Sequence, residues 1–143
     1  MKLWLALLLP TAPAAAQAQA ADEFCAGLNR IVAAARETDP FASVDAERPN
    51  RVLAFASFCF KVQFGAVRFS CIADRPGTEV TREGVAAEVR RCLPAALPDP
   101  APDAEDPHSK DTRLLADGVP ILIMAREFAE GRTVSLVVWP PRD

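Results

Sequence analysis

The stretch Phe58–Ala73, FCFKVQFGAVRFSCIA, decides the fold expected for this chain. Apolar and polar residues alternate on both sides of Gly65, which is the pattern of two half-buried strands. Glycine at the first central position is what a two-residue type II′ turn requires, because that position needs a positive φ. The stretch therefore predicts a β-hairpin that turns at Gly65 and Ala66.

This turn implies a register for the two strands. Phe64 would lie opposite Val67 and Phe60 opposite Cys71, which gathers the apolar side chains on one face for packing against the core. The face expected in the core consists of Phe58, Phe60, Val62, Phe64, Val67, Phe69, Cys71 and Ala73. Cys59 would lie on the opposite face, with the polar side chains.

Residues 1–20 have the parts of a secretory signal peptide. They contain one basic residue, Lys2, an apolar run, Leu3–Leu9, and the cleavage motif Ala18–Ala20. Removal of this segment leaves a single domain over residues 21–143. A bilayer span needs about 20 apolar residues, and no stretch reaches that length, so we expect no transmembrane span in the mature chain.

The charge balance excludes some classes of partner. Lys2 is the only charged residue before the cleavage motif, so its loss changes the net charge from −3 to −4. Nucleic acids and anionic membranes reward a basic surface, and an acidic chain is therefore not expected to bind them. The expected location is the periplasm or the outside of the cell.

Four cysteines, Cys25, Cys59, Cys71 and Cys92, lie in the mature part. An even number in a small exported domain predicts two disulfides, and the spacing fits no C-x-x-C redox or zinc motif. The expected register puts Cys59 and Cys71 on opposite faces, which disfavours a bond between them. We therefore predict the pairs Cys25–Cys59 and Cys71–Cys92.

Helical periodicity and capping residues predict two helices, one over 22–37 and one over 82–92. A second hairpin is expected from Val119–Phe128 and Arg132–Trp139, which are rich in β-branched residues. The segment 94–118, rich in proline and aspartate, is expected to be a long loop. The predicted fold is a disulfide-braced α+β two-layer domain, with about four antiparallel strands and two helices in the order α-β-β-α-β-β.

The second hairpin has apolar residues on both faces. One face, with Ile121 and Leu136 at its centre, is expected in the core. The other face holds Leu122, Met124, Phe128, Val137 and Trp139. This face is unusually apolar for a solvated surface, so either the long loop or a binding partner is expected to cover it.

The sequence predicts no catalytic residue, no metal ligand and no cofactor site. The single histidine, His108, lies in the proline-rich loop without a second ligand, and no nucleotide-binding or nucleophile motif is present. The expected function is a non-enzymatic interaction module, an inhibitor or accessory protein that binds a protein in the cell envelope or outside the cell. The alternatives are a small-ligand-binding protein and a hydrolase that uses dispersed carboxylates.

Overall fold

The computed structural model describes residues 14–45, 52–99 and 111–142. Its helices are α1 (Ala14–Ala34), α2 (Ala42–Asp45) and α3 (Arg82–Cys92). Its strands are β1 (Phe58–Val62), β2 (Arg68–Asp74), β3 (Leu97–Pro98), β4 (Thr112–Ala116), β5 (Val119–Phe128) and β6 (Gly131–Val138). The strands form one antiparallel sheet in the order β1-β2-β6-β5-β4-β3.

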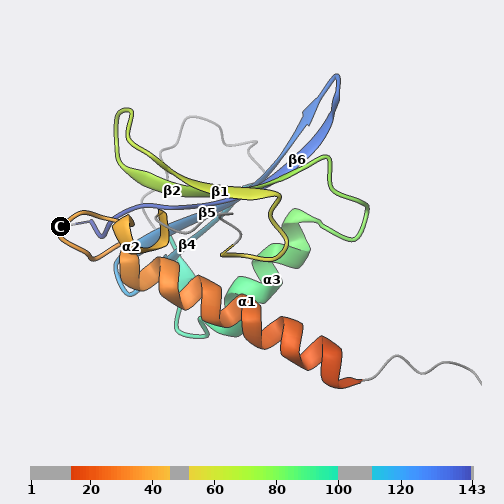
Figure 1. Cartoon of the computed structure of the whole chain (residues 1–143), viewed down its shortest axis with the longest axis horizontal. Helices are drawn as coiled ribbons and strands as arrows, with labels where there is room; N and C mark the ends of the chain where they lie inside the picture. Colours follow the sequence, from red (N-terminus) through yellow and green to blue (C-terminus); the bar gives the residue numbers. More distant parts are fainter. Residues whose placement is uncertain (1–13, 46–51, 100–110, 143) are drawn as a thin grey trace, which may run out of the picture.

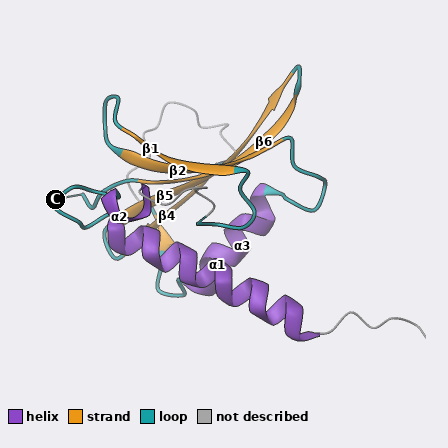
Figure 2. Cartoon of the chain, viewed as in Figure 1, coloured by secondary structure: helices purple, strands orange, loops and turns teal. Residues whose placement is uncertain are grey.

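The helices lie together on one side of this sheet (Figure 1), and the secondary-structure colouring in Figure 2 shows the same two layers. The core fills the space between the layers. Leu28 and Ile31 from α1 and Val89 from α3 are fully buried there, as are Ile123 and Leu136 from the sheet. The α+β class is thus confirmed, and we call the sheet face toward the helices the inner face and the opposite face the outer face.

The sheet has six strands where the sequence predicted about four. The additional strands, β3 and β4, come from the segment 94–118 that was expected to be a loop. A tight turn at Asp117 and Gly118, both with positive φ, joins β4 to β5. Asp-Gly between apolar runs is a strong hairpin signal. The segment was nevertheless predicted to be a loop, because prolines and acidic residues upstream dominate its composition. Residues 100–110, with His108, and residues 1–13 lie outside the described part of the chain.

Helix α3 has the predicted bounds because its signals are local. The Thr81 side chain accepts a hydrogen bond from the N–H of Gly84 at 3.0 Å, which caps the first turn. Helix α1 instead begins at Ala14, before the predicted start at residue 22, and ends at Ala34, before the predicted end at residue 37. The N–H of Phe41 donates to the carbonyl of Ala34 at 2.8 Å, and the buried Phe41 ring stacks on Phe69. Tertiary packing of Phe41 therefore replaces the last turn of the helix.

The first hairpin turns where expected but with a different register. Gly65 has a φ of +68°, and the loop covers five residues, 63–67, because Val62 pairs with Arg68. The predicted register was therefore wrong by one residue, and Cys59 lies opposite Cys71. Since side chains alternate along a strand, this shift turns Phe58 and Phe60 to the outer face.

Candidate interaction face

The two disulfides join different cysteines from those predicted. The bonds are Cys25–Cys92 and Cys59–Cys71, so the presence of two disulfides is confirmed and the predicted pairing was wrong. The error follows from the register, because the expected pairing separated Cys59 and Cys71 onto opposite faces. In the structure these residues face each other across β1 and β2, with their Cα atoms 4.1 Å apart.

The neighbouring residue Lys61 explains why this cross-strand bond fits. The Lys61 N–H points away from β2 and donates to the Asp45 carboxylate at 3.0 Å. By alternation, Cys59 also lies at a non-hydrogen-bonded position of the ladder, where opposed Cα atoms come closest. The Lys61 side chain is buried on the inner face, and its ammonium group forms an ion pair with Asp39. The paired charge allows the lysine to occupy a buried position on the inner face, although the predicted register placed it on the polar face.

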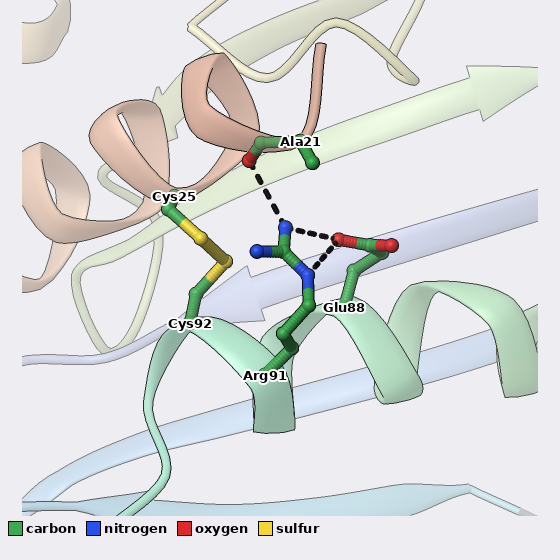
Figure 3. Close-up of a disulfide and its surroundings, with 5 residues drawn as sticks. All are labelled: Ala21, Cys25, Glu88, Arg91 and Cys92. Carbon is green, nitrogen blue, oxygen red and sulfur yellow. Dashed lines mark hydrogen bonds and ion pairs between the residues drawn. A yellow bond between two sulfur atoms is a disulfide. The ribbon is translucent and has the colours of Figure 1, made fainter. Parts of the chain in front are cut away.

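The second disulfide fastens α1 to α3 (Figure 3). Cys25 and Cys92 are half-buried, with their Cα atoms 5.0 Å apart. Beside them, the Arg91 guanidinium donates to the Glu88 carboxylate and, at 3.0 Å, to the backbone carbonyl of Ala21. The start of the predicted mature chain is thus held at the same place as the disulfide.

The outer face carries the five residues that the sequence singled out from the second hairpin. Leu122 pairs with Val137, and both side chains are at least nine-tenths buried. Met124 and Trp139 are half-buried, and Phe128 is 61% exposed near the end of β5. Figure 1 shows the β5–β6 hairpin projecting away from the helices.

Sequence reasoning missed four apolar residues of the same face. Phe58 and Phe60 on β1 stack with their ring centroids 5.8 Å apart, and Phe58 is 45% exposed. Leu97 on β3, 67% exposed, pairs with Leu115 on β4, which in turn pairs with Pro120. Alternation alone could not identify these residues. It sorts the side chains of a strand into two sets, but it does not show which set faces the helices. A register that places Cys59 directly opposite Cys71 would have predicted that Phe58 and Phe60 lie on the outer face.

Two serines lie in the middle of the outer face. Ser70 on β2 and Ser135 on β6 are only 6% and 8% exposed. They pair with Val137 and Ile72, so they belong to the same face as Leu122 and Phe60. Among the described residues, neither hydroxyl has a hydrogen-bond partner. A buried hydroxyl without a partner costs free energy, so an acceptor from a bound molecule would stabilise this region.

The charged side chains of the outer face are mostly arginines. Arg126 forms a bidentate ion pair with Asp111, with nitrogen–oxygen distances of 2.7 and 2.8 Å. Arg68 donates to the carbonyls of Phe64 and Ala66, at 3.4 and 3.3 Å. Arg113 is opposite Leu122. Within the described ranges, neither Arg68 nor Arg113 contacts a carboxylate, and the apolar face therefore carries two cations without an acidic partner.

Other features lie away from this face. The hydroxyl and the N–H of Ser43 donate to the Glu37 carboxylate and lower the pKa of this exposed group. In the described part of the chain, no group of three or more histidine, cysteine or acidic residues could hold a metal ion. The helices described here include none that is both long and apolar enough to cross a membrane.

Comparison of the chain with protein-family models, curated proteins and solved structures found no match.

Proposed function

We propose that this protein is an exported, non-enzymatic interaction module that binds another protein through the outer face of its sheet. The observation that carries the proposal is the apolar character of both sheet faces when the described helices cover only one. A sheet of a two-layer domain normally presents polar side chains to solvent. The exposed apolar side chains of this face, Phe58, Leu97 and Phe128, lie on the two edge strands and at the end of β5, where a bound protein would cover them.

Two features support export. Residues 14–20 are exposed, and the first buried side chain of α1 is Phe24, so cleavage after Ala20 would remove no part of the core. The two disulfides are the kind of bond that persists in the periplasm or outside the cell. An inhibitor or an accessory protein acting in such a compartment would have to keep its binding face rigid without a large core, and disulfides provide that rigidity.

Affinity capture from the native envelope or culture fluid, with matched variants, tests this proposal. Phe58→Ser removes an exposed aromatic ring from the outer face. Phe64→Ser makes the same change in the loop between β1 and β2, where the ring is 89% exposed and outside the strands. We expect a protein that is recovered with the wild type and with Phe64→Ser, and lost with Phe58→Ser.

Two results would contradict the proposal. Equal recovery of every captured protein by the two variants would show that the outer face does not bind them. Turnover of a polymer substrate by the purified protein, with no partner recovered, would instead favour the hydrolase that uses carboxylates.

A further inference from the structure

The β5–β6 hairpin extends beyond the strands on either side of it. Strand β4 pairs with β5 only as far as Ile123, and β2 pairs with β6 only as far as Thr133. Beyond these positions, among the described strands, β5 and β6 pair only with each other, up to Phe128 and Gly131. Figures 1 and 2 show this hairpin projecting from the sheet. Its end therefore forms a protrusion that fits a concave surface.

Hydrogen bonds hold the base of the hairpin from both sides. On the β5 side, Arg126 forms the bidentate ion pair with Asp111. On the β6 side, the Arg132 guanidinium donates to the Gly77 carbonyl at 3.0 Å, and the Arg132 carbonyl accepts the Arg75 N–H at 2.9 Å. A protrusion that is ordered before binding loses little conformational entropy when it binds. The hairpin is thus suited to insertion into a preformed site.

The end of the hairpin presents one large apolar side chain. Phe128 is 61% exposed, and it lies on the same face of β5 as Met124. It pairs with Gly131, so no side chain lies directly opposite the ring. Ala129 and Glu130 form the two-residue turn beside it, and both are exposed. Aromatic side chains that fill a pocket of the partner contribute much of the binding energy in protein–protein interfaces.

The charged side chains next to this ring are acidic. Glu127 and Glu130 lie within two residues of Phe128, and both are exposed. Arg132 lies opposite Glu127, but its guanidinium donates to the Gly77 carbonyl instead. Within the described ranges neither glutamate forms an ion pair, so the end of the hairpin carries two negative charges without a partner. Basic residues around a pocket would complement these charges, whereas an anionic membrane surface would repel them.

We propose that the end of the β5–β6 hairpin inserts Phe128 into an apolar pocket of the partner protein, with basic residues of that protein next to Glu127 and Glu130. This inference rests on the proposed function, since it specifies which part of the outer face enters the partner and the chemistry of the site that receives it. The pocket removes the aromatic ring from water, and the charge pairs fix the orientation of the hairpin.

Photo-crosslinking tests this proposal with a defined probe. In the full chain, Phe128→benzoylphenylalanine keeps an aromatic side chain at the end of the hairpin and makes it reactive toward C–H bonds under light. The matched control carries the same replacement at Phe64, an exposed phenylalanine in the loop at the opposite end of the sheet. Each protein is irradiated in the native envelope fraction or culture fluid, and peptide mass spectrometry identifies the labelled residues.

We expect the probe at Phe128 to label one protein, at apolar residues that have lysine or arginine close by. The probe at Phe64 should label that protein at least tenfold less. Phe128→Ser should weaken binding of the purified labelled protein about tenfold or more, because the pocket is left unfilled. Circular dichroism of each variant verifies that the fold is retained.

The two glutamates are tested by charge reversal. Glu127→Lys combined with Glu130→Lys should also weaken binding of the labelled protein about tenfold and reduce the dependence of binding on salt concentration. Asp22→Lys combined with Glu23→Lys, at exposed positions of α1, changes the net charge by the same amount and should leave binding unchanged. Equal weakening by both double variants would contradict a role for the charges at the hairpin.

Other outcomes would overturn the inserted hairpin. Labelling of a second copy of this chain would assign the hairpin to self-association. Sedimentation with phosphatidylcholine vesicles that is lost in Phe128→Ser would assign it to a membrane. If the Phe128 probe labels no protein and capture still depends on Phe58, the inserted hairpin is wrong although the proposed function holds. If capture depends on neither phenylalanine, both fail.

Discussion

At the scale of single residues, Gly27 shows how closely two segments approach each other. A Cβ atom at this position of α1 would lie 2.1 Å from the backbone carbonyl oxygen of Val52. This contact is with backbone, so no side-chain rotation can relieve it. The close approach brings Leu53, which is fully buried, into the core beside α1. Glycine is required here for space, although alanine has the higher intrinsic helix propensity.

Gly27→Ala should therefore destabilise the protein despite that propensity. We expect a loss of about 2–3 kcal/mol in the free energy of unfolding, because the helix must move away from Val52. Urea denaturation followed by circular dichroism measures this loss. Asn29→Ala on the exposed side of the same helix is the control and should change stability by less than about 0.5 kcal/mol. Equal stability of wild type and Gly27→Ala would show that α1 does not approach Val52 this closely.

At the scale of elements, helix α3 and strand β1 behave differently. Helix α3 carries its own start signal, the Thr81 cap, and basic residues in its last turn, so its bounds follow from nearby residues. Strand β1 has alternating residues but no local feature that selects which side faces the core. At the free edge of β1, the Lys61 N–H donates to the Asp45 carboxylate. This donor is therefore not exposed for pairing with another strand.

The cap of α3 can be tested with two threonines in the same loop. Thr81→Ala removes the acceptor for the Gly84 N–H and should lower the free energy of unfolding by about 1 kcal/mol. Thr81→Ser keeps a hydroxyl at the same place and should restore most of that stability. Thr78→Ala, at an exposed position outside the helix, should have little effect. If both alanine variants lose the same stability, the effect does not come from the cap.

At the scale of the whole molecule, the two disulfides have different surroundings. Cys59–Cys71 lies within the core, with side chains 3% and 0% exposed. Cys25–Cys92 lies near the surface and connects the two long helices across 67 residues of sequence. Cys59–Cys71 lies in the layer between the helices and the sheet, and Cys25–Cys92 lies at the border of that layer. Neither disulfide lies on the outer face, so both stabilise the protein from the side of the helices.

This difference predicts the order in which reductant opens the bonds. Thiol exchange requires access to sulfur, so mild reduction should release Cys25 and Cys92 before Cys59 and Cys71. Alkylation during reduction, followed by peptide mass spectrometry, identifies the labelled residues. Full reduction should also lower the melting temperature, since closing a loop as long as that between Cys25 and Cys92 stabilises by about 4 kcal/mol. Simultaneous labelling of all four cysteines, or an unchanged melting curve, would contradict this assignment.

Local sequence signals predicted a substantial part of the fold. The bounds of α3, the reversal of the chain at Gly65 and the apolar faces of β5 and β6 all depend on residues within a few positions of each other. The cysteine count likewise predicted two disulfides. The candidate face was partly identified for the same reason, because the continuous apolar run of β5 already indicates a strand that is covered on both sides.

The sequence by itself thus determined the α+β class, helix α3, the reversal of the chain near Gly65 and the apolar character of β1, β2, β5 and β6, because nearest neighbours along the chain decide these features. Only the tertiary structure decided the disulfide partners, the inclusion of β3 and β4 in the sheet and the outward position of Phe58 and Phe60. These depend on which distant segments pack together. A shift of one residue in strand pairing reverses every side chain of β1, and only the packed neighbours of Cys59 and Lys61 select between the two arrangements.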